Sequence, residues 1–300
     1  MIKLTLKGLP GIFILSFKEF KRNEPLRLAG ATAFFTTFAL PPILIILVQI
    51  IGLVLRKDGI SRNFFSSLTK ILGKPGAMQI EETFKGFTSL AKNQWIAVCG
   101  FVFLLFVATT LFKVIKDSLN QLWNVRIADN KPVIQLRGRL ISLGIILIAG
   151  FLFVAALLAE GLEAFLHRYT GSWHSLTGSF INTIINQTIS VVIVTAWFSI
   201  LFKMLPDAKV SWRVAVAGGL FTGLLFSIGK FLIRSMLTAG NLSNIFGASS
   251  SIVLLLLFVF YCAFILYYGA CFTKVYAVYV QDPIKPGDHA IQYKMVEVKG

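Results

Sequence analysis

Acidic residues are scarce in this chain. Its 300 residues include 13 Asp and Glu against 29 Lys and Arg, and charged residues make up only 14% of the total. Hydrophobic residues make up 56%, which is typical of integral membrane proteins rather than of soluble domains. In a membrane protein, an excess of Lys and Arg more often reflects contacts with anionic lipid headgroups on the cytoplasmic side than binding of nucleic acid. We therefore expect membrane lipids as partners, and no nucleic acid.

Cysteine and histidine are also rare, with three of each. Cys99, Cys262 and Cys271 lie in apolar runs without a CxxC pair, which excludes a disulfide framework and a cysteine-based zinc site. The sequence contains no P-loop, HExxH motif or nucleophile elbow. We expect no enzyme activity, no catalytic residues, no cofactor and no metal ligands.

The first long uncharged stretch covers residues 28–55, and a run of about 20 apolar residues suffices to cross a bilayer. Its first half is small and hydroxylated, which favours close helix contacts. Pro41 and Pro42 follow. Each proline removes a backbone donor and disfavours helical geometry in the residue before it. We predict a helix break at this pair inside the membrane, where protein or trapped water must satisfy the freed carbonyls.

The hydropathy pattern predicts an all-α integral membrane protein with a bundle of six transmembrane helices. Amphipathic helices are expected in the N-terminal segment and in the first outer loop, residues 56–94. The predicted divisions are a cytoplasmic interfacial segment at 1–27, a membrane domain at 28–273 and a cytoplasmic tail at 274–300, with spans at about 28–55, 95–115, 140–158, 180–202, 214–237 and 251–273.

The distribution of basic residues predicts the orientation. Lys and Arg are more frequent in the segments that lie inside if both termini are cytoplasmic. The N-terminal run does not resemble a cleavable signal peptide, because basic residues follow where a cleavage site would be expected. We predict a multi-pass protein of a bacterial inner membrane with both termini in the cytoplasm.

Three motifs resemble the YihY/BrkB family of bacterial inner-membrane proteins. They are AGATAFFTTFALPPILI in the first span, Leu119-Asn120-Gln121-Leu122-Trp123 after the second, and Ile245-Phe246-Gly247-Ala248 before the last. The resemblance covers about residues 10–280. It implies a membrane protein for which transport has been suggested, and whose earlier ribonuclease BN label is regarded as a misassignment. Where the family often has Gly-Ala-Glu in its last helix, this chain has Cys271, so no role of that carboxylate is carried over.

The fifth span carries two cations. Lys230 and Arg234 are four residues apart and share one helical face. Ionisable groups inside a span are costly and usually face a cavity or a partner. The alternative is that both side chains extend to the outer membrane surface, as long basic side chains near a helix end do.

Glu160, Glu163 and His167 fall on one helical face after the third span. These three residues could bind a metal ion only with a fourth ligand, and the sequence offers none at a fixed spacing. An ion pair with Lys230 or Arg234 is the simpler interpretation, because the third and fifth spans both run outward and place these groups at similar depth. A solvated helix end is the remaining alternative.

Asn182, Asn186 and Ser190 form a polar stripe on the fourth span. Such a stripe either holds helices together or lines a pathway. At the end of the second span, Lys116 is expected to contact lipid headgroups, and Trp123 is expected to anchor the chain at the membrane interface.

Two classes of function remain. Pro41, Pro42 and the charged groups inside spans favour a transporter-like protein of unknown substrate, for which an anion is one candidate. The alternative is a non-transporting envelope-maintenance or structural membrane protein, in which polar residues serve packing. A homo-oligomer is compatible with either class.

Overall fold

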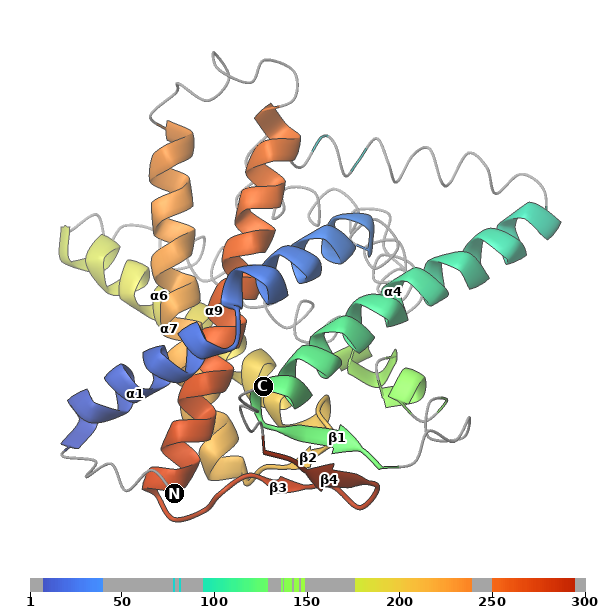
Figure 1. Ribbon diagram of the computed structural model, residues 1–300. Coiled ribbons are helices and arrows are strands. Elements are labelled where there is room, and N and C mark those ends of the chain that lie inside the picture. Colours follow the sequence, from blue (N-terminus) through green and yellow to red (C-terminus); the bar gives the residue numbers. More distant parts are fainter. Residues whose placement is uncertain are drawn as a thin grey trace.

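The computed structural model describes residues 8–39, 94–128, 176–238 and 250–294, together with residues 78, 81, 136, 138–141, 143–145, 147 and 148. Within this part the chain is mostly helical (Figure 1). The helices are α1 (Gly8–Arg22), an unlabelled helix over residues 25–39, α4 (Gln94–Leu122), α6 (Leu176–Met204), α7 (Trp212–Thr238) and α9 (Ser250–Tyr279). The predicted break at Pro41 and Pro42 lies outside the described residues.

Among the described residues, three helices are long and apolar enough to cross a membrane. The apolar stretches are Gln187–Met204 in α6, Trp212–Leu232 in α7 and Leu256–Tyr279 in α9. These helices cover the sequences predicted as the fourth, fifth and sixth spans. The chain is thus a mostly helical membrane protein, and the total of six spans remains a prediction.

Helix α7 lies between α6 and α9 and contacts both (Figure 1). Its remaining face carries exposed apolar side chains at intervals of four residues: Val216, Leu220, Leu224 and Ile228. A continuous apolar stripe of this kind is suited to lipid. The buried core continues from these helices to the end of α4, and its largest fully buried side chains include Trp123, Phe202 and Tyr267.

Helix α1 lies across α9 rather than along it (Figure 1). Ile12, Ser16 and Phe20 recur every four residues on its buried face, and the Phe20 ring meets that of Phe264 edge to face at a centroid distance of 4.8 Å. The chain then turns at Glu24, whose φ of 50° is left-handed. The helix over residues 25–39 follows and buries Ala29 and other small residues of the first motif.

In the described part of the chain, four short strands lie together at one end of the bundle, which we call the strand end (Figure 1). They are β1 (Val125–Ile127), β2 (Ala208–Lys209), β3 (Lys285–Pro286) and β4 (Ala290–Gln292). Strand β4 pairs antiparallel with β1, and β3 pairs antiparallel with β2. The tail after α9 therefore binds both the segment after α4 and the link between α6 and α7. The prediction of an all-α fold did not include these strands, because segments of two or three residues carry no periodic signal.

Candidate functional site

The motif at the end of α4 is buried. Leu119 and Leu122 have no exposed surface, and Trp123 is 1% exposed. The indole Nε1 of Trp123 donates a hydrogen bond to the backbone carbonyl of Ala270 in α9 at 3.0 Å. The expectation that Trp123 anchors the chain at the lipid interface is wrong. An aromatic residue at the end of a span is commonly interfacial, but here the ring packs against Phe202 of α6 and α9 provides the hydrogen-bond acceptor.

Asn120 in the same motif binds Asp207, which follows α6. Its Nδ2 donates to Asp207 Oδ2 at 2.8 Å, and its Oδ1 accepts from the Asp207 backbone N–H at 2.9 Å. The Asp207 carboxylate also pairs with Lys116 Nζ at 2.7 Å. Because Lys116 is only 9% exposed and is paired within the protein, the expectation that it contacts lipid headgroups is wrong as well.

Asp207 also connects to the tail. Its backbone carbonyl accepts a hydrogen bond from the Gly287 N–H at 2.9 Å. A Cβ at position 287 would lie 2.9 Å from that same oxygen, so the close approach requires glycine. One aspartate thus connects α4, the link between α6 and α7, and the tail.

The carboxyl of Asp117 has a perturbed environment. Partial burial raises the pKa of Asp117 above its ordinary value, although the residue keeps exposed surface, and Asp207 raises it further. Lys113 and Lys116 act in the opposite direction and lower the pKa.

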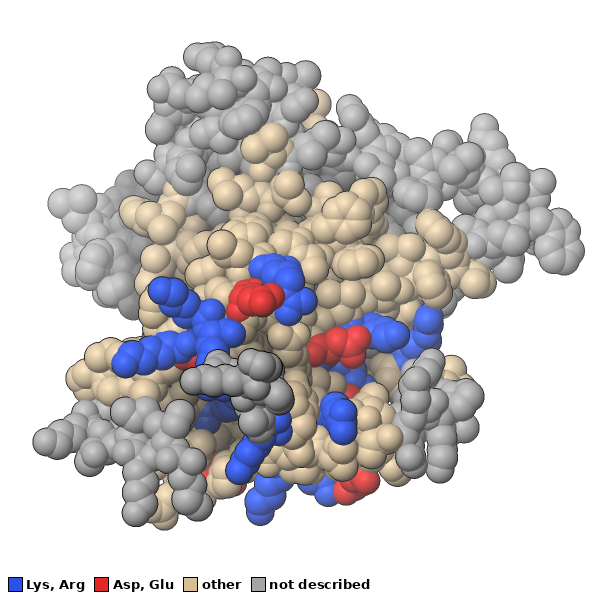
Figure 2. All heavy atoms as spheres, in the orientation of Figure 1, with Lys and Arg blue, Asp and Glu red and all other residues tan. Residues whose placement is uncertain are grey.

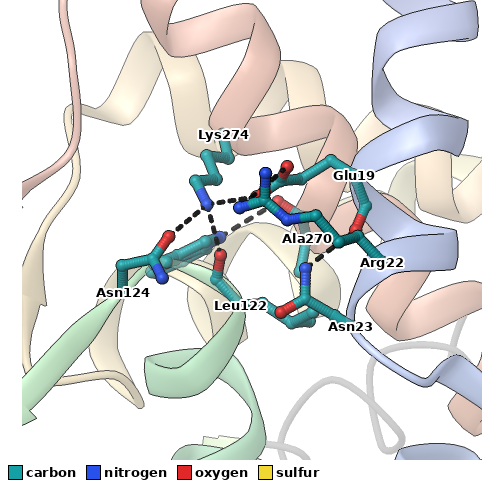
Figure 3. Close-up of polar contacts among 8 residues, drawn as sticks. Glu19, Arg22, Asn23, Leu122, Asn124, Ala270 and Lys274 are labelled. Atoms are coloured by element: carbon teal, nitrogen blue, oxygen red, sulfur yellow. Dashed lines mark hydrogen bonds and ion pairs between the residues drawn. The ribbon is translucent and has the colours of Figure 1, made fainter. Parts of the chain in front are cut away.

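A second cluster surrounds Lys274 in α9 (Figure 3). Its ammonium group donates to Glu19 Oε1 at 2.6 Å, to the Leu122 carbonyl at 2.7 Å and to Asn124 Oδ1 at 2.6 Å. An ammonium has three donors, so Lys274 is fully satisfied. Asn124 has a left-handed φ of 57°, which asparagine tolerates better than most residues. This turn ends α4 and brings the amide oxygen to Lys274.

The two clusters form one layer of paired polar groups at the strand end. We call it the strand-end polar layer: Glu19, Lys116, Asn120, Asn124, Asp207 and Lys274. Sequence reasoning missed Glu19, Asp207 and Lys274 as members of one layer. The available signal was a single lysine directly after a long apolar run, at Lys274. In the part of the chain that the structure describes, no group of three or more His, Cys, Asp and Glu side chains could hold a metal ion.

A different polar contact lies within the candidate spans. Lys230 Nζ of α7 donates to Ser190 Oγ of α6 at 3.2 Å. Both residues are half-buried, and Lys230 makes further interactions within the protein. The structure therefore brings together one predicted cation and one member of the predicted polar stripe.

The other predicted site residues cannot be placed at this contact. Asn182 and Asn186 lie on α6 and Arg234 lies on α7, but their side chains are outside the described residues. Glu160 and Glu163 are also outside them. The expected ion pair between the third and fifth spans stays a prediction.

Glycines allow the helices around Lys230 to approach closely. A Cβ at Gly219 would lie 2.7 Å from the Thr195 carbonyl oxygen and 2.8 Å from the Ser199 backbone nitrogen of α6. On the other side of α7, a Cβ at Gly229 would clash with the Tyr261 ring of α9. The glycine-rich sequence of α7 is thus a packing surface for two neighbouring helices.

The first motif also contributes a buried polar contact. The Thr32 hydroxyl is hydrogen-bonded to the Tyr267 hydroxyl of α9, and both residues are almost completely buried. The hydroxylated half of the first span thus faces α9 at this position.

Comparisons with known proteins decide the family. The sequence profile described as "Virulence factor BrkB" matches residues 16–291. The chain belongs to the BrkB family. Within it, the LNQLW segment of this BrkB protein supplies Asn120 and Trp123 to the strand end, and the AGATA segment supplies Thr32 to the buried contact with α9.

Curated relatives of this BrkB protein are named as membrane proteins. A UPF0761 membrane protein of Teredinibacter turnerae is 23% identical over 261 residues, which cover 87% of this chain and 59% of the relative. A UPF0761 membrane protein of Pseudomonas paraeruginosa is 26% identical over 247 residues, which cover 81% of this chain and 57% of the relative. The chain spans less than two thirds of the length of these relatives. No solved structure matches it.

Proposed function

We propose that this BrkB-family protein transports a small anionic solute across the bacterial inner membrane. The observation that carries the proposal is the contact between Lys230 and Ser190, because it puts an ammonium group between two apolar helices. A charged side chain at the centre of a membrane helix costs about 3 kcal/mol on insertion scales, and such residues commonly mark solute or ion pathways.

In this proposal the solute approaches along the facing sides of α6 and α7. Asn182 and Asn186 continue the Ser190 stripe by helical periodicity, and Arg234 lies one turn beyond Lys230 on α7. When an anion arrives, the Lys230 ammonium gives up contacts that it makes within the protein and pairs with the anion instead. Glu160, Glu163 and the break at Pro41 and Pro42 are proposed parts of the same pathway.

The strand end is proposed to be the cytoplasmic side, where this conformation is closed. Lys116 and Lys274 each pair with a carboxylate there, so opening this end would require both ion pairs to separate or move together. Both termini would lie on that side. No catalytic step is part of the proposal.

A structural role in the envelope is the second candidate. Close packing at Gly219 and Gly229 favours it, because a tightly packed bundle leaves little room for a solute. In that case Lys230 is a cation held by neighbouring helices, and Ser190 is one of its fixed partners.

Water access to position 230 distinguishes the two candidates. Single cysteines are introduced at positions 230, 228 and 294 in a background without Cys99, Cys262 and Cys271. Ile228 is 55% exposed on the lipid-facing side of α7, and Lys294 is exposed on the tail. We expect a small charged thiol reagent to modify position 230 far faster than 228, though more slowly than 294. Equal inertness of 230 and 228 would favour the structural role.

A further inference from the structure

The outer surface of α1 has two chemically different faces. Phe13 and Phe17 are exposed by 41% and 55%. Lys18, Lys21 and Arg22 are exposed on the neighbouring face. Helical geometry places the aromatic pair beside the buried face and the three cations beyond it. This order, from core to apolar surface to basic surface, is that of a helix lying at a membrane surface.

The two aromatic residues connect α1 with the membrane helices. The Phe13 ring lies 5.6 Å from the Phe221 ring of α7 and 5.6 Å from the Phe272 ring of α9, measured between centroids. Phe17 meets Tyr268 edge to face at 6.1 Å. Each ring thus contacts the bundle while keeping exposed surface, which places it at the edge of the lipid-facing surface.

The only acidic residue of α1 does not neutralise the basic face. Glu19 is directed to Lys274, 2.6 Å away, and its side chain is only 16% exposed. Its contact with Arg22 is longer, at 3.7 Å, and the Arg22 side chain remains 57% exposed. Within the described residues, neither Lys18 nor Lys21 pairs with a carboxylate. Figure 2 shows such Lys and Arg side chains gathered in the half of the molecule that contains the strand end.

We propose that the outward face of α1 binds the phosphate headgroups of anionic phospholipids. Phe13 and Phe17 would lie against the acyl chains, and Lys18, Lys21 and Arg22 would contact the phosphates. The strand-end polar layer contributes to this surface by turning Glu19 inward to Lys274. This lipid binding does not depend on whether the protein transports a solute.

Binding of single lipids to the full chain, measured by native mass spectrometry, tests this inference. The probes are phosphatidylglycerol and phosphatidylcholine, and the variant is K18Q/K21Q/R22Q. Each basic residue near an anionic surface changes affinity by roughly fivefold. We therefore expect the variant to bind phosphatidylglycerol at least about tenfold more weakly, with little change for phosphatidylcholine.

The matched control is R126Q/K285Q/K294Q. It removes the same charge from exposed residues of the strands and the tail, and should retain the affinity for phosphatidylglycerol. Equal weakening in both triple variants would contradict a site on α1, as would wild-type affinity in the α1 variant. If the triple variant does not fold, the single variants K18Q and K21Q test the same site. Each is expected to weaken the binding of phosphatidylglycerol several-fold, and wild-type affinity in both would contradict the site.

Discussion

Asn120 and Asp207 are 87 residues apart and bind each other twice, with the side-chain amide of Asn120 holding both the carboxylate and the backbone N–H of Asp207. N120A removes both hydrogen bonds and leaves a half-buried backbone donor without its acceptor. We expect the free energy of unfolding to fall by about 2–3 kcal/mol. Unfolding of the detergent-solubilised protein measures the change. Q121A, at the neighbouring position, should have a much smaller effect, and equal effects would contradict the role given to Asn120.

Lys274 and Glu19 should be energetically coupled. K274M leaves the Glu19 carboxylate largely buried without its cation, and breaking such a pair from one side should cost about 2–4 kcal/mol. The double variant E19Q/K274M should cost less than the sum of the single variants, because neither change then leaves an unpaired charge. Additive losses in a double-mutant cycle would show that the 2.6 Å contact contributes no coupling.

Gly219 and Gly30 should respond in opposite ways to alanine. A Cβ at Gly219 would meet backbone atoms of α6, which no side-chain rotation can relieve, whereas a Cβ at Gly30 would meet nothing within 4 Å. We expect G219A to lower the free energy of unfolding by about 1–3 kcal/mol. G30A should be neutral or raise it by up to about 1 kcal/mol, because alanine favours the helix. Thermal unfolding of both variants checks the order.

Strand pairing predicts a common side for the α6–α7 link and the tail. Lys209 and Lys285 are partners in the β2–β3 pair, and both side chains are exposed. In a background without native cysteines, K209C and K285C should each react with an impermeant thiol reagent only from the cytoplasmic face. Labelling of the two positions from opposite faces would contradict the pairing. Labelling of both from outside would reverse the orientation.

The apolar helices could be predicted from the sequence, whereas their polar contacts could not. Residues 214–237 were predicted as a span, and α7 covers Trp212–Thr238, because a long apolar run in lipid must satisfy its backbone within a helix. The pairing of Lys116 with Asp207 depends on how helix ends distant in sequence come together. For that reason Lys116 was assigned to lipid, and the structure shows it paired within the protein.

The candidate site was anticipated in a similar, partial way. Lys230 and Ser190 were each identified as polar residues inside spans, from their position in apolar sequence alone. Their contact at 3.2 Å was not predicted, because the facing sides of α6 and α7 depend on packing at Gly219. A helical repeat shows which residues share a face but does not identify the helix opposite that face.

Solute flux into proteoliposomes tests the central claim most directly. The wild-type protein is compared with K230A across chloride, sulfate, phosphate, gluconate, potassium and an uncharged osmolyte. S227A is the matched control, since Ser227 lies one turn before Lys230 in the same helix and binds the Gly223 carbonyl of that helix at 3.0 Å. We predict flux of at least one anion with the wild type and S227A, and its loss in folded K230A. Absence of flux for every solute with the wild type, or undiminished anion flux in K230A, would contradict the claim.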